Sequence, residues 1–157
     1  MNLASSIIAK YANDPNSYLR QFGRVQDLAT GQPILFDPAV ASFHCQQTIL
    51  HYFTNTPRDK NDFTKWLVLL GPRQVGKSTV PEMCALVKTM FNPGWDHLCL
   101  ADDVPRDQYL HGRVHYTYLH LPKQVRTPAI RSIEVNQKSF DPRVGGRLRI
   151  GSTRRKG

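Results

Sequence analysis

The chain has 157 residues, 40% of them hydrophobic, and a formal net charge of +9 at pH 7. This length allows one domain with a hydrophobic core. No apolar run approaches the roughly 18 residues of a membrane span, and no basic residues precede the short apolar N-terminal stretch as they would in a secretion signal. The three cysteines form no C-x-x-C pair, so the sequence predicts neither a zinc site nor a disulfide framework and favours a reducing cytoplasm.

The N-terminal part is predicted to contain short elements separated by turn residues. A helix is expected over residues 5–11, a second helix over 16–22 and a short extended piece over 34–36. We interpret residues 1–37 as an N-terminal extension and residues 38–157 as the principal domain.

The middle of the chain predicts a helix, a strand and a second helix. Residues 43–53 form the first helix, with Ser42 as its N-cap. Residues 66–70, Trp-Leu-Val-Leu-Leu, are a short apolar run typical of a buried parallel strand. Residues 79–90 form the second helix, in which one apolar stripe is made by Met83, Leu86, Val87 and Met90.

The loop between this strand and this helix reads Gly-Pro-Arg-Gln-Val-Gly-Lys-Ser-Thr over residues 71–79. It fits G-x-x-x-x-G-K-[ST], the phosphate-binding loop of nucleoside-triphosphate enzymes. Lys77 is a cation for the β- and γ-phosphates, and the Ser78 hydroxyl suits Mg²⁺. The alternative, a glycine turn with a solvated lysine, is disfavoured because strand and helix flank the motif. The predicted nucleotide contacts are Gly71, Pro72, Arg73, Gln74, Val75, Gly76, Lys77, Ser78 and Thr79.

After this helix, strands and helices continue to alternate. A strand is predicted at 97–101, a helix from 105 to 119, a strand at 132–135, a turn-rich stretch at 136–146 and a half-exposed strand at 147–151. This alternation predicts an α/β fold, a parallel sheet flanked by helices, with the glycine loop at the carboxyl end of a strand.

The positive charge is concentrated in the last quarter of the chain. Residues 123–157 contain ten Lys or Arg and two acids, a balance of +8, whereas the preceding 122 residues carry only +1. A basic segment of this kind favours a polyanion such as DNA or RNA. The alternative is a solvated basic surface.

The segment from Arg73 to Thr79 resembles the phosphate loop of the large terminase subunit of tailed bacteriophages, which often carries an arginine shortly before Gly-Lys-Ser/Thr. The helix with Gln46 and Gln47 is similar to the adenine-recognition region of that family. The resemblance covers roughly residues 40–157. It implies a P-loop NTPase-like fold of the RecA/ASCE type, ATP and Mg²⁺ as cofactors, and an ATP-driven motor that moves double-stranded DNA into a procapsid.

The resemblance also implies residue roles and partners. Arg73 and Lys77 are the predicted catalytic residues, Ser78 the metal ligand, and Gln46 or Gln47 the adenine reader. The alternatives are a DNA-facing or surface position for Arg73 and a solvated helix position for the glutamines. The implied partners are double-stranded DNA, the small terminase subunit, the portal protein and further copies in a ring, in the cytoplasm of an infected bacterium.

A second ATPase element, an apolar strand ending in Asp-Glu, is not found in these residues. Asp102-Asp103 follows an apolar strand, but we do not assign it this role. The resemblance places the missing strand after the basic segments, so residues 38–157 are expected to be part of a longer ATPase domain, incomplete at its C-terminus and without the nuclease domain. We therefore expect nucleotide binding with negligible turnover. Glu82 is expected to be a helix-surface charge.

Two other functions fit the same features. One is a different P-loop enzyme that acts on DNA, such as a helicase or a recombinase-like protein. The other is a non-catalytic basic DNA-binding protein with a vestigial loop. The arginine in the loop and the preceding Gln46 helix favour the terminase interpretation.

Overall fold

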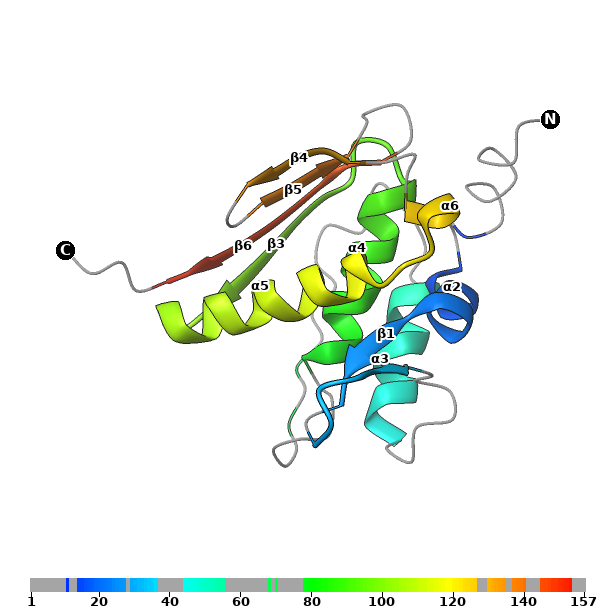
Figure 1. The fold of residues 1–157 in the computed structure, drawn as a ribbon. Coiled ribbons are helices and arrows are strands. Elements are labelled where there is room, and N and C mark those ends of the chain that lie inside the picture. The colour runs from blue at the N-terminus through cyan, green and yellow to red at the C-terminus, as the bar shows by residue number, and fades with distance from the viewer. Residues whose placement is uncertain are drawn as a thin grey trace.

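The computed structural model describes residues 11, 14–27, 29–36, 44–55, 68, 70, 78–126, 130–134, 137–140 and 145–153, and Figure 1 shows their arrangement. The elements are α2 (Pro15–Phe22), β1 (Arg24–Gln26), β2 (Pro33–Leu35), α3 (His44–Asn55), α4 (Thr79–Phe91), β3 (Asp96–Ala101), α5 (Val104–Leu119), α6 (Lys123–Arg126), β4 (Ile130–Glu134), β5 (Gln137–Phe140) and β6 (Arg147–Ser152).

The larger sheet has the strand order β3-β6-β5-β4. Strands β3 and β6 are parallel, and their register runs from Asp96 opposite Arg147 to Ala101 opposite Ser152. Strands β5 and β4 join antiparallel, and β1 and β2 form a separate antiparallel pair. The predicted α/β class is therefore confirmed, with helices against one parallel pair of strands. The predicted parallel pairing is found for β3 and β6, whereas the short adjacent strands β4 and β5 pair antiparallel, as a hairpin-like unit does.

Two predictions of local structure need correction. The stretch predicted to be turn-rich, 136–146, contains strand β5, because pairing with β4 and β6 overrides the local turn signals. Val68 and Leu70, the described residues of the predicted buried strand, lie in no strand and are 76% and 93% exposed. An apolar run signals burial but not a pairing partner. The rest of that segment lies outside the described residues.

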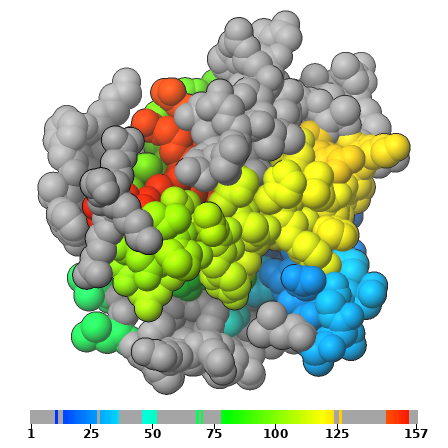
Figure 2. All heavy atoms as spheres, turned by 60° about the vertical axis from the view of Figure 1, so that its left-hand side comes forward, coloured from blue at the N-terminus to red at the C-terminus, as the bar shows by residue number. Residues whose placement is uncertain are grey.

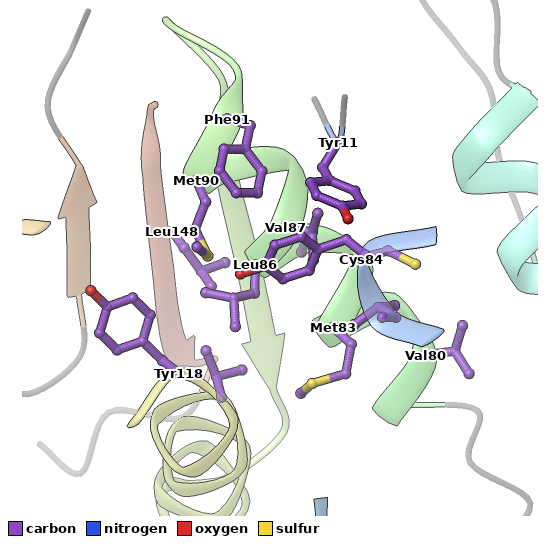
Figure 3. Close-up of a cluster of buried hydrophobic side chains, with 14 of the residues drawn as sticks. Tyr11, Val80, Met83, Cys84, Leu86, Val87, Met90, Phe91, Tyr118 and Leu148 are labelled. Atoms are coloured by element: carbon purple, nitrogen blue, oxygen red, sulfur yellow. The ribbon is translucent and has the colours of Figure 1, made fainter. Parts of the chain in front are cut away.

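Helix α4 is the centre of the hydrophobic core. It packs against α2, α3 and α5 and against β3 and β6, so buried side chains occur all around it rather than on one stripe. In Figure 3 its side chains gather with Leu148 of β6 and Tyr118 of α5. Helix α2, in the segment predicted to be an N-terminal extension, joins the same core, since its Tyr18 ring lies at a centroid distance of 5.2 Å from the ring of Phe91.

Helix α5 begins with residue types that are common at helix N-termini. Asp103 is the N-cap, and its side chain accepts a hydrogen bond from the backbone N–H of Arg106 at 2.9 Å. Pro105 lies in the first turn, where its missing N–H costs little. The helix continues through Gly112. Figure 2 shows α5 crossing the molecular surface beside the β1–β2 pair, whose Arg24 carbonyl accepts a hydrogen bond from Thr117 Oγ1 at 2.7 Å.

A close approach between Gly146 and Trp95 ties β6 to the turn that follows α4. The N–H of Gly146 donates to the Thr89 carbonyl at 2.7 Å, and the N–H of Arg147 donates to the Trp95 carbonyl at 2.8 Å. A Cβ atom at position 146 would lie 1.8 Å from that carbonyl oxygen, so only glycine fits. Because a short turn joins α4 to β3, the two run in opposite directions, and α4 begins toward the carboxyl ends of β3 and β6 (Figure 1).

Candidate functional site

The first turn of α4 begins where the phosphate-loop motif ends. Residues 71–77, including Arg73 and Lys77, lie outside the described residues, and Ser78 and Thr79 are described. Ser78 is the exposed N-cap residue of α4, and its carbonyl accepts a hydrogen bond from the Glu82 N–H at 3.2 Å. Its hydroxyl makes no capping hydrogen bond. The predicted metal ligand is therefore at the helix start, with a hydroxyl that the helix itself does not use.

The backbone of this turn offers donors to an anion. The first N–H groups of an α-helix have no intrahelical partner, and the helix dipole places partial positive charge beside them. Pro81, the third residue of α4, has no N–H, so the N–H groups at this end without an intrahelical partner are those of Ser78, Thr79 and Val80. An anionic group is favoured at this position.

A side-chain network joins the first turn of α4 to α5. Arg113 Nη1 donates to Thr79 Oγ1 at 3.0 Å, and Arg113 Nη2 donates to both carboxylate oxygens of Glu82, at 2.6 and 2.7 Å. The guanidinium carbon of Arg113 lies 4.8 Å from the centre of the Tyr109 ring. The Thr79 hydroxyl is thus held by α5, whereas Ser78, one residue earlier, stays exposed.

The expectation that Glu82 is a helix-surface charge is wrong. It is only 4% exposed, not a surface charge. Burial raises its pKa from 4.5 to about 7, against the opposing effect of the Arg113 guanidinium. Burial, with a smaller contribution from Glu82, also raises the pKa of the Cys99 thiol to about 11, so this thiol is protonated at neutral pH. The available signal was that Glu82 is the single acid in a mostly apolar helix.

The two candidate adenine-reading glutamines occupy different environments on α3, the helix that packs against α4. Gln46 is 6% exposed, so the alternative of a solvated helix position is wrong for this residue. Gln47 is exposed. Of the two, only Gln47 therefore presents its side chain at the surface, where a ligand can reach it.

The acidic pair after β3 has structural partners. Asp103 caps α5, and Asp102 forms an exposed ion pair with Arg106. In the described part of the chain, no group of three or more His, Cys, Asp or Glu residues could hold a metal ion. The rings of His111 and His115 are stacked, with their centroids 5.9 Å apart.

Two arginines of the basic C-terminal quarter lie on the exposed side of β6. Arg147 and Arg149 alternate with the buried Leu148 and Ile150, which face the helices. Both guanidinium groups reach the same carboxylate, that of Asp96 on β3, at 3.1 and 3.2 Å. One carboxylate therefore pairs with two guanidinium groups, so these three side chains together carry a net charge of +1.

No protein-family model matches the chain, and no curated protein matches it significantly. None of the helices in the described ranges combines the length and apolar character needed to cross a membrane.

Proposed function

We propose that this chain provides the ATP-binding part of a viral DNA-packaging motor of the terminase large-subunit type. The observation that carries the proposal is the position of Ser78. The residue that follows Gly-Lys in the motif stands exposed at the start of α4, with a hydroxyl that makes no cap hydrogen bond. A 13-residue helix directly after the loop supplies the dipole and the N–H groups that a phosphate-binding loop needs.

In this proposal each residue acts according to its chemistry. Lys77 binds the β- and γ-phosphates, and Ser78 ligates Mg²⁺, which when bound neutralises charge on the transferring phosphoryl group. Arg73 stabilises the same charge. The N–H groups of Thr79 and Val80 face the anion, and Gln47 is the preferred adenine reader because its side chain is exposed.

Double-stranded DNA is the proposed polymer partner. The support is the charge of +8 over residues 123–157 and the exposed pair Arg147 and Arg149 on β6. The small terminase subunit, the portal protein and a ring of identical subunits complete the proposed motor, which works in the cytoplasm of an infected bacterium.

The test is equilibrium binding of ATP in the presence of Mg²⁺. The informative variants are Lys77→Ala and, as a control with the same change of charge at the other end of α4, Lys88→Ala. The proposal predicts that Lys77→Ala loses binding and that Lys88→Ala retains it. Equal binding by the two variants, or no binding by the unmodified chain, would contradict the proposal.

A further inference from the structure

Arg113 connects two elements that are distant in the sequence at the point where the proposed nucleotide site begins. Its two terminal nitrogens contact Thr79 and Glu82, which are 34 and 31 residues away. Thr79 adjoins Ser78, and the Glu82 N–H donates to the Ser78 carbonyl. The Arg113 guanidinium therefore holds both Thr79, which follows Ser78 in the chain, and Glu82, which lies one helical turn after Ser78.

Burying the Glu82–Arg113 ion pair costs free energy, because both charged groups are removed from water. The Glu82 side chain is 5% exposed and that of Arg113 is 24% exposed, so both charges have lost much of their hydration. Buried ion pairs contribute little net stability compared with apolar side chains of similar size, but their directional hydrogen bonds can specify one arrangement of the elements they join. Here the arrangement specified is that of the first turn of α4 relative to α5.

We infer that Arg113 is a positioning residue for the metal–nucleotide site: through Thr79 and Glu82 it fixes the first turn of α4 and so the place of the Ser78 hydroxyl. The inference rests on the proposed function. Mg²⁺ accepts only near-octahedral geometry with short ligand distances. A small displacement of Ser78 therefore weakens the part of nucleotide binding that depends on the metal, and leaves the part that does not involve the Ser78 hydroxyl.

The experiment compares the affinity for ATP with Mg²⁺ and for ATP in EDTA. Thr79→Val is the main variant, because it removes the hydroxyl that accepts from Arg113 and leaves the buried Glu82–Arg113 pair intact. Arg113→Lys keeps the charge but loses the planar fork that reaches two acceptors. Arg106→Gln is the control, since this arginine lies on the same helix in an exposed ion pair with Asp102. Thermal unfolding of each variant checks that it is folded.

The inference predicts that Thr79→Val and Arg113→Lys weaken Mg²⁺–ATP binding by about fivefold or more, the lower end of typical couplings between sites, and leave binding in EDTA unchanged. The double variant is expected to lose no more than Arg113→Lys alone, because Arg113→Lys already removes the hydrogen bond to the Thr79 hydroxyl. Arg106→Gln is expected to bind like the unmodified chain.

Two results overturn the inference alone. In the first, Thr79→Val binds Mg²⁺–ATP with unchanged affinity. In the second, Thr79→Val loses the same affinity with and without the metal, which would show that the contact is purely structural. Absence of ATP binding by the unmodified chain, or binding that persists in Lys77→Ala, overturns the proposed function and the inference together. The two failures are therefore distinguishable.

Discussion

Arg113 Nη2 lies 2.6 and 2.7 Å from the two carboxylate oxygens of Glu82, and this contact joins α5 to the first turn of α4 inside the protein. It places a titratable acid four residues after Ser78, in a helix whose other buried residues are almost all apolar. The pair therefore links the stability of the fold to the region in which we propose that nucleotide binds.

Glu82 gives the first prediction, a stability that falls as the pH rises. The folded chain keeps the Glu82 proton up to a pKa of about 7, whereas the unfolded chain releases it above 4.5. Between these values the folded state binds more protons, so the free energy of unfolding decreases by roughly 3 kcal/mol. Urea unfolding from pH 4.5 to 7.5 should show that Glu82→Gln lacks this decrease. Parallel curves for the variant and the unmodified chain would contradict the assignment.

His97 gives the opposite dependence. Burial, with a further contribution from Lys88, lowers its pKa from 6.5 to about 4. The unfolded chain therefore binds this proton below pH 6.5 while the folded chain does not, and stability is lost as the pH falls from 6.5 to 4, by roughly 3 kcal/mol. His97→Gln should remove this loss. Because Glu82 and His97 act in opposite directions, the two single variants should have slopes of opposite sign between pH 4.5 and 6.5.

Two glycines provide a matched test of the fold. Gly146→Ala would place a Cβ 1.8 Å from the Trp95 carbonyl oxygen, so it should destabilise the protein by about 3 kcal/mol or more. Gly112→Ala, inside α5, should stabilise it by about 0.5–1 kcal/mol, because the added Cβ would meet nothing within 4 Å beyond its chain neighbours and the backbone of its own helix. Thermal or urea unfolding measures both. A neutral Gly146→Ala would show that β6 does not begin against Trp95.

The exposed arginines of β6 predict the salt dependence of DNA binding. Arg147→Gln and Arg149→Gln should each weaken binding to double-stranded DNA of any sequence and reduce the slope of log affinity against log salt by about 1. Arg106→Gln, the same charge change on α5, should leave the slope unaltered. If all three variants behave alike, net charge rather than the β6 surface determines binding.

Local patterns predicted much of the fold. The apolar stripe of α4 and the alternation of polar and apolar residues in β6 predicted these elements within a few residues of their observed bounds, and the helix expected from 105 to 119 is α5. Strand pairing was harder to predict, because the local pattern of a strand does not determine which other strand it pairs with. Residues 68 and 70 show this, since their apolar character indicated burial and both are exposed.

The candidate site was predictable only where it is local in sequence. Ser78 and Thr79 followed from the spacing of the motif, and the structure places them at the helix start. The contact of Arg113 with Thr79 and Glu82 spans more than 30 residues and depends on how α5 crosses α4. No pattern within one helix contains that information. Glu82 was therefore assigned to the surface, although its position among apolar residues was visible.

Nucleotide binding at the first turn of α4 can be measured by an NMR titration of the ¹⁵N-labelled chain with Mg²⁺–ATP, followed at assigned backbone amides. We expect the largest shifts at the first turn of α4, above all for Thr79 and Val80, and small shifts at Phe91, the other end of the helix. Lys77→Ala should abolish these shifts. Unchanged amides at Thr79 and Val80 at saturating nucleotide, or shifts confined to other parts of the chain, would show that the start of α4 is not a nucleotide site.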